Sequence, residues 1–218
     1  MISEKRAFGL MVPGVVTKAP NRKVFQPFDG TEIAEVAGSD VAVVEHALET
    51  AHRLYRNRSN WLPMYKRIEI LHKTIEIMKE RSEDLALEAA REGGKPLMDS
   101  KIEVSRAISS LEVCIEVLRT DAGSVIPMNI NAASANRIAM TRPEPIGVVV
   151  AVSAFNHPLN LIVHQVGPAV ACGCPVIVKP AEDTPISCLR FVEILIEAGL
   201  PPEWCQAVVT EMGYVPVK

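Results

Sequence analysis

The sequence of 218 residues lacks the features that define several large classes of protein. No apolar run approaches the roughly 20 residues that a membrane-spanning helix needs. Residues 1–10 lack the apolar core and the cleavage site of a signal peptide. The formal net charge is only −3, so the sequence carries no electrostatic footprint for nucleic acid. We therefore expect a cytoplasmic protein that binds neither membranes nor nucleic acid.

Cysteine is scarce, and phosphate-loop motifs are missing. The five cysteines are odd in number and lie mostly in apolar segments, which favours buried reduced thiols. Cys172 and Cys174 are the one close pair, but no second Cys/His pair stands nearby to complete a metal site. Neither G-x-G-x-x-G nor G-x-x-x-x-G-K-[ST] occurs. The sequence therefore predicts no metal site and gives no standard nucleotide fingerprint.

The first part of the sequence predicts an arm followed by four helices. Residues 7–38 contain several Pro, Gly and Asn turn signals and are typical of an irregular or hairpin arm. Four stretches with helical spacing of apolar residues follow, starting near Asp40, Pro63, Ser82 and Pro96. Asp40 and Ser82 are predicted N-caps, and Gly93-Gly94 is expected to end the third helix. The apolar positions predicted for the first and fourth helices are Val41, Val44, Ala47, Leu48, Ala51 and Leu54, and Ile102, Val104, Ile108, Leu111, Ile115 and Leu118.

Residues 124–142 break the helical period. Short alternating stretches at Val125–Ile130 and Arg137–Thr141 flank a small polar run, so the sequence predicts a β-hairpin. A hairpin that projects from the body would be an assembly element, and one that packs down would be an extra sheet edge. The residues alone do not choose between these, because an exposed edge needs either a partner or a cover.

After Pro145 apolar strands alternate with helices. Ile146–Val152 and Pro175–Val178 are rich in valine and isoleucine, as are strands buried on both faces of a parallel sheet. Residues 158–171 and 185–198 supply covering helices, and Gln206–Thr210 starts a third strand. The predicted fold is α/β, with N-terminal helices, a hairpin and part of a Rossmann-like parallel sheet. The three parts are residues 1–123, 124–142 and 143–218.

Polar residues follow the first two of these strands. Ligands of open α/β sheets sit beyond the carboxyl ends of the strands, and Asn156, Lys179 and Glu182 lie there. The Asn156 amide could donate to a developing oxyanion, although its position alone favours a helix cap. Lys179 and Glu182 could form a structural ion pair or bind ribose hydroxyls, and the residues alone favour neither interpretation.

Longer motifs at these positions carry a resemblance to a known family. The sequence resembles the NAD(P)-dependent aldehyde dehydrogenase superfamily in the order and spacing of Pro145–Val149, Ser153–Leu159, Val178–Pro185 and Ala198–Pro202. The stretch Arg91–Pro96 also looks like the N-terminal part of that family. The resemblance covers nearly the whole chain and implies an aldehyde dehydrogenase-like fold.

The resemblance implies a role for each polar turn. Asn156 would stabilise the oxyanion of a thiohemiacetal, while Lys179 and Glu182 would hold the adenosine ribose. A carboxylate at the ribose repels a 2′-phosphate, which favours NAD over NADP. The 124–142 hairpin resembles the family's oligomerisation strands, which implies a homo-oligomer. The residues expected to line the cofactor cleft are Ser153, Ala154, Phe155, Lys179, Pro180, Ala181 and Glu182.

Departures from the family concern both the turns and the length. Phe155 stands where the family usually has tryptophan, and Cys174 where it commonly has asparagine. Family enzymes are about twice as long, and none of the five cysteines has the context of their nucleophile. We therefore expect the N-terminal portion of an NAD(P)-dependent enzyme that oxidises a small-molecule aldehyde, inactive by itself. The alternatives are a non-catalytic nucleotide-binding or assembly module, or one half of a split enzyme.

Overall fold

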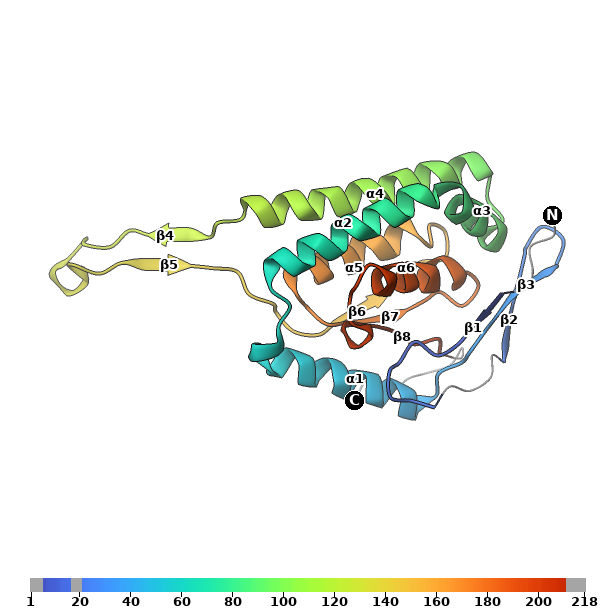
Figure 1. Cartoon of the computed structure of the whole chain (residues 1–218), viewed down its shortest axis with the longest axis horizontal. Coiled ribbons are helices and arrows are strands. Elements are labelled where there is room, and N and C mark those ends of the chain that lie inside the picture. The colour runs from blue at the N-terminus through green and yellow to red at the C-terminus, as the bar shows by residue number, and fades with distance from the viewer. Residues whose placement is uncertain (1–5, 17–20, 211–218) are drawn as a thin grey trace.

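The computed structural model describes residues 6–16 and 21–210, and it begins with a small sheet (Figure 1). Strand β3 (Glu32–Val36) pairs antiparallel with β2 (Arg22–Phe25) and parallel with β1 (Arg6–Phe8). Gly30, at φ +73°, closes the turn between β2 and β3. The predicted arm therefore contains the hairpin that its turn signals indicated, while residues 17–20 of that arm lie outside the described residues.

Four helices follow: α1 (Val41–Arg56), α2 (Met64–Glu80), α3 (Ser82–Gly93) and α4 (Leu97–Thr120). The Asp40 carboxylate accepts from the Val43 N–H at 3.0 Å, which confirms the predicted N-cap. Gly94, at φ +62°, ends α3 as predicted. The Ser82 cap was wrong, because α3 follows α2 after a single residue. That residue, Arg81, occupies the N-cap position without a side-chain capping bond.

The buried faces of α1 and α4 differ from the predicted stripes. Val41 and Leu48 of α1 are exposed, because the helix turns Val43, Ala47 and Ala51 toward the sheet. In α4, Ile102 is exposed and its neighbour Glu103 is buried instead. Periodicity therefore located both helices correctly but assigned the wrong residues to part of each buried face.

The hairpin of β4 (Ser124–Ile126) and β5 (Ala139–Thr141) projects from the body, as Figure 1 shows. Its strands are shorter than predicted, and the segment between them includes a short 3-10 turn at Ala132–Ser134. The hairpin therefore does not pack down on the body, and the assembly role expected of a projecting hairpin stays a prediction. The hairpin region has five exposed large hydrophobic side chains, Val125, Ile126, Ile130, Ile138 and Met140.

The predicted parallel sheet is confirmed. It has the order β6 (Val149–Val152), β7 (Val176–Lys179) and β8 (Cys205–Ala207), and both pairings are parallel. Helices α5 (Asn160–Cys172) and α6 (Ile186–Glu197) cover one face, and α1 lies against the other (Figure 1). Strand β8 ends earlier than predicted, because the Val209 N–H already bonds the Ser39 hydroxyl at 3.1 Å.

The main core lies between the sheet and the helices α2 to α6. The largest fully buried side chains include Phe191 of α6, Leu71 and Met78 of α2, and Leu111 of α4, so they come from three different helices. Within the described part of the chain, no helix is both long and apolar enough to span a membrane.

Candidate functional site

Two turns meet at the carboxyl ends of β6 and β7. The register pairs Val152 with Lys179, and the Ser153 N–H donates to the Lys179 carbonyl at 2.9 Å. The Thr184 hydroxyl donates to the Phe155 carbonyl at 3.3 Å and so joins the second turn to the first. The segments Ser153–Asn156 and Lys179–Glu182 therefore lie side by side, where an open α/β sheet binds its ligand.

Asn156 is exposed in the first turn and does not cap a helix. Helix α5 begins later, at Asn160, with Leu159 at the N-cap position and no side-chain bond from that residue. Position alone favoured the cap, so that interpretation was wrong. The side-chain amide remains exposed at the carboxyl edge of the sheet, beside the exposed Phe155 ring.

Lys179 and Glu182 come together in the second turn without pairing. Among the described residues, the ion pairs do not include one between these two side chains, and the Lys179 ammonium donates to the Pro180 carbonyl at 3.3 Å. Both side chains are partly exposed, Pro180 is buried, and Ala181 is half-buried between them. A cation and a carboxylate therefore keep bonding capacity at the edge where ribose hydroxyls would lie, so the residues fit a dinucleotide.

Two buried glutamates that the sequence analysis missed hold the starts of the neighbouring helices. Glu103 of α4 accepts from the Leu159 and Asn160 N–H groups at 2.8 and 2.9 Å. Glu92 of α3 accepts from the Ile186 and Ser187 N–H groups at 2.7 and 2.8 Å. A carboxylate at a helix N-terminus is stabilised by the dipole and by otherwise unpaired N–H groups. Burial nevertheless raises the pKa of Glu92 to about 7.

Lys95 links Glu103 to the first turn. Its ammonium forms an ion pair with Glu103 and lies 3.4 Å from both the Asn156 carbonyl oxygen and the His157 Nδ1. Burial lowers the pKa of Lys95, and burial with the nearby Lys95 charge lowers the pKa of His157. The sequence does contain a signal for the buried role of Glu103, because this glutamate occupies a core-facing position of α4, next to Val104 and one turn before Ala107.

The cysteines provide no activated thiolate at these turns. Burial raises the pKa of Cys205 to about 12, and burial also raises the pKa of Cys188. Cys172 departs from the expected burial and is exposed, although partial burial of its thiol raises the pKa. It also ends α5, a helix of 13 residues. It is thus about 20 Å along the axis from the start of the helix, and the turn that contains Asn156 precedes that start.

No group of three or more His, Cys, Asp and Glu side chains in residues 6–16 and 21–210 is arranged to hold a metal ion.

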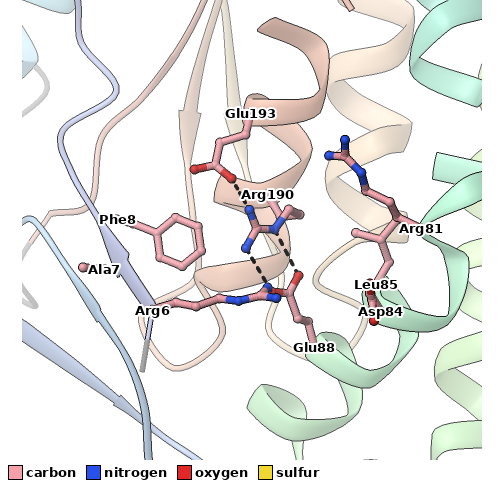
Figure 2. A pocket seen from close by; sticks show the side chains of 9 residues that line it. All are labelled: Arg6, Ala7, Phe8, Arg81, Asp84, Leu85, Glu88, Arg190 and Glu193. Atoms are coloured by element: carbon pink, nitrogen blue, oxygen red, sulfur yellow. Dashed lines mark hydrogen bonds and ion pairs between the residues drawn. The ribbon is translucent and has the colours of Figure 1, made fainter. Parts of the chain in front are cut away.

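A separate pocket of about 470 Å³ lies between β1, α3 and α6 (Figure 2). There Glu88 accepts from Arg190 at 3.1 and 3.2 Å and also pairs with Arg6. The third arginine, Arg81, pairs with Glu197 at 2.5 Å. Because all three guanidinium groups are paired, this pocket joins three elements and does not offer a free cation.

Comparison with known proteins assigns the chain to a family. The model of the aldehyde dehydrogenase family matches residues 16–215, and the chain belongs to this family. It is 35% identical to 3-sulfolactaldehyde dehydrogenase of Priestia megaterium over 201 residues, 92% of this chain and 42% of that protein. The predicted family and fold are therefore confirmed.

Solved structures agree with this assignment. Aldehyde dehydrogenase 21 of Physcomitrella patens, in complex with the product succinate, matches with a TM-score of 0.87 and 28% identity. That match covers 96% of this chain and 44% of the other. Glyceraldehyde-3-phosphate dehydrogenase of Methanocaldococcus jannaschii, complexed with NADP, matches with a TM-score of 0.81 and 28% identity over 89% and 42% of the two chains. The chain thus spans less than half the length of these relatives.

Proposed function

We propose that this chain supplies the cofactor-binding side of an NAD(P)-dependent aldehyde dehydrogenase. The observation that carries the proposal is the pairing of Val152 with Lys179, which brings the Asn156 turn beside the Lys179–Glu182 turn. The bound dinucleotide would accept the hydride removed from the aldehyde carbon. In the parent reaction the aldehyde becomes a carboxylic acid with water as the oxygen source.

The residues of the two turns have separate tasks in this proposal. The Lys179 ammonium donates to ribose hydroxyls and the Glu182 carboxylate accepts from them, since neither group pairs with the other. The exposed Phe155 ring forms an apolar wall of the cleft. Asn156 presents an amide N–H to the carbonyl oxygen of the aldehyde, where negative charge develops. Lys95 contacts the Asn156 carbonyl oxygen and Glu103 accepts from the Leu159 N–H, so the two side chains hold the backbone at and after that residue.

The preference for NAD over NADP is a finer part of the proposal. Solved relatives hold NADP in one case and NAD+ in another, so both cofactors occur in this fold. In this chain the carboxylate of Glu182 would stand close to a 2′-phosphate and repel it. We infer that NAD binds more tightly than NADP.

The chain alone is proposed to be inactive as a dehydrogenase. Acyl transfer needs a thiolate, and raised pKa values keep the Cys188 and Cys205 thiols protonated at neutral pH. Aldehyde-dependent NADH production by the purified chain would refute this part.

Cofactor binding is tested by titrating the purified chain with NAD, NADP and ADP-ribose in a calorimeter. We expect NAD and ADP-ribose to bind, and Lys179→Ala or Glu182→Ala to weaken both at least tenfold. Lys101→Ala and Glu83→Ala are matched controls, because these residues pair with each other on α3 and α4 at 2.7 Å. Glu182→Gln should narrow the difference between NAD and NADP. Equal binding by the Lys179 variant and the control would contradict the proposed ribose site.

A second candidate function is subunit assembly through the β4–β5 hairpin. The hairpin projects from the body and carries its apolar side chains in the open (Figure 1). Exposed apolar groups of this kind mark interaction surfaces, and exposed strand edges need a partner. We infer that the hairpin joins copies of the chain into a homo-oligomer, and this role is compatible with cofactor binding.

A further inference from the structure

The ammonium of Lys95 has three hydrogen-bond acceptors around it. It pairs with the Glu103 carboxylate and lies 3.4 Å from both the Asn156 carbonyl oxygen and the His157 Nδ1. A lysine ammonium carries three N–H donors and no acceptor, so three acceptors use its full capacity. The Nδ1 atom accepts only while it carries no proton. The arrangement around Lys95 is therefore complete only with a neutral His157 ring.

The same contacts fix the backbone that carries the Asn156 amide. Lys95 contacts the Asn156 carbonyl oxygen, and Glu103 accepts from the Leu159 and Asn160 N–H groups at 2.8 and 2.9 Å. The Asn156 side chain is exposed, and no hydrogen bond within the described residues holds its amide. The direction of that amide therefore depends on where Lys95 and Glu103 hold the backbone.

The His157 ring lies among charged groups of α4 and of the turn before α4. Its Nδ1 is 3.6 Å from the Glu103 carboxylate, and 45% of the side chain is exposed. Lys95 and Arg106 place positive charge near the ring, and Asp99 places negative charge there. Partial burial and the two cations lower the pKa of His157 below its ordinary value of 6.5. The ring is therefore neutral at pH 7 and takes a proton only in more acidic solution.

A proton on Nδ1 changes the ring from an acceptor into a donor. The protonated ring repels the Lys95 ammonium, which lies 3.4 Å away, and attracts the Glu103 Oε2 atom. Lys95 pairs with that same oxygen, so the ring and the ammonium then compete for it. We therefore expect protonation of the ring to displace the ammonium from the Asn156 carbonyl oxygen.

We propose that His157 is a positioning residue for the side-chain amide of Asn156, because its neutral ring holds the Lys95 ammonium against the Asn156 carbonyl oxygen and its protonated ring releases it. The inference rests on the proposed function, since the direction of the amide matters to the reaction only if Asn156 donates to the oxyanion. An oxyanion donor has to lie about 3 Å from the developing charge, so small displacements of the donor weaken it. The geometry thus favours the reaction while His157 is neutral.

Nuclear magnetic resonance of the 218-residue chain tests the proposal. Selective isotope labelling of asparagine makes each side-chain amide visible, and Asn156→Ala identifies the signal of Asn156. This signal is followed from about pH 5 to pH 8, the range in which histidine titrates, together with the ring protons of His157. The measurement needs neither dinucleotide nor aldehyde.

Three variants separate the ring from other causes of a pH response. His157→Gln is the matched variant, because a carboxamide oxygen can accept from Lys95 as the neutral ring does but takes no proton in this range. His52→Gln is a control, since His52 is an exposed histidine on α1. Glu92→Gln is needed because Glu92 has a pKa of about 7 and is also influenced by the Lys95 charge.

We expect the Asn156 amide signal of the wild-type chain to shift with the same midpoint as the His157 ring, below pH 6.5. The shift should disappear in His157→Gln and persist in His52→Gln and Glu92→Gln. In Lys95→Met the ring should still titrate, with a midpoint higher by about half a pH unit or more because a nearby cation is gone. The Asn156 amide should no longer follow it.

Four results would overturn the proposal. They are an Asn156 signal that does not respond to pH in the wild-type chain, a response that His157→Gln retains, a response that Glu92→Gln abolishes, and a response that Lys95→Met retains. The last result would mean that the charge of the ring acts on the amide by proximity alone. Circular dichroism checks the fold of each variant. If Lys95→Met does not fold, the double variant with Glu103→Gln replaces it, because that variant leaves no buried charge unpaired.

Titration with ADP-ribose keeps this inference distinct from the proposed function. His157→Gln should bind ADP-ribose within about twofold of the wild-type chain, because its substitution leaves Lys179 and Glu182 in place. A wild-type chain that does not bind ADP-ribose would refute the cofactor site, while the pH response of Asn156 would still be measured. A large loss of binding in His157→Gln would mean that His157 supports both turns, which would overturn its specific role at Asn156.

Discussion

Replacing Glu92 with glutamine should change how stability depends on pH. Burial raises the pKa of this carboxyl group to about 7 in the folded chain, against an ordinary value of 4.5. Between these two values the folded protein keeps the proton and the unfolded chain loses it. Stability is therefore fully present below pH 4.5 and is lost as the pH rises toward 7.

The magnitude follows from the size of the shift. A change of one pKa unit corresponds to about 1.4 kcal/mol, so the contribution lost across this window is about 3 kcal/mol. That is a large share of the roughly 5–15 kcal/mol that stabilises a typical domain. Glutamine resembles the neutral acid in shape and cannot ionise, so Glu92→Gln should not show this loss.

Urea unfolding followed by circular dichroism between pH 4.5 and pH 8 measures the effect. We expect the variant to gain stability relative to wild type, by about 3 kcal/mol over the window. Glu112→Gln is the control, because Glu112 is an exposed glutamate paired with Lys79 at 2.7 Å. A constant difference between wild type and Glu92→Gln would refute the reasoning. It would mean that the Ile186 and Ser187 N–H groups keep the buried carboxylate ionised.

Two further predictions concern the ion pair and the hairpin. Glu103→Gln leaves the Lys95 ammonium buried without its partner and should lower the free energy of unfolding in urea by about 3–5 kcal/mol. Adding Lys95→Met to this variant should recover part of the lost stability. The prediction would be contradicted if the effects of Glu103→Gln and Lys95→Met on the free energy of unfolding were strictly additive. Replacing the cross-strand pair Val125 and Met140 with serine should reduce the mass seen by light scattering, with unfolding changed by less than about 0.5 kcal/mol. A wild-type chain that is already a monomer would contradict the assembly role.

The elements that the sequence predicted well have local causes. Asp40 lies directly before a helical apolar pattern, and its carboxylate needs only the nearby Val43 N–H to act as a cap. The valine-rich strands β6 and β7 are short continuous apolar runs, which few structures other than a covered parallel sheet accommodate. The two polar turns could therefore be placed at one edge of the sheet from the sequence, while the roles of their side chains stay predictions.

The features that escaped prediction depend on contacts between distant residues. Glu92 and Glu103 find their partners in α6 and α5, and periodicity alone assigns glutamates to solvent. Strand β1 is only 3 residues long and pairs with β3 across a long separation, so its own residues carry little signal. The same reason explains Ser82, whose apparent capping position is taken by the nearly continuous passage from α2 into α3.

The capping of α5 and α6 from other helices limits how this chain can be divided. Each helix beside the two polar turns starts on a carboxylate that belongs to α4 or α3. A fragment starting at residue 143 would retain both turns and all three parallel strands, yet it would leave four N–H groups at the two helix starts without their acceptors. The segment of residues 82–120 and the two polar turns therefore have to be inherited, exchanged or engineered together.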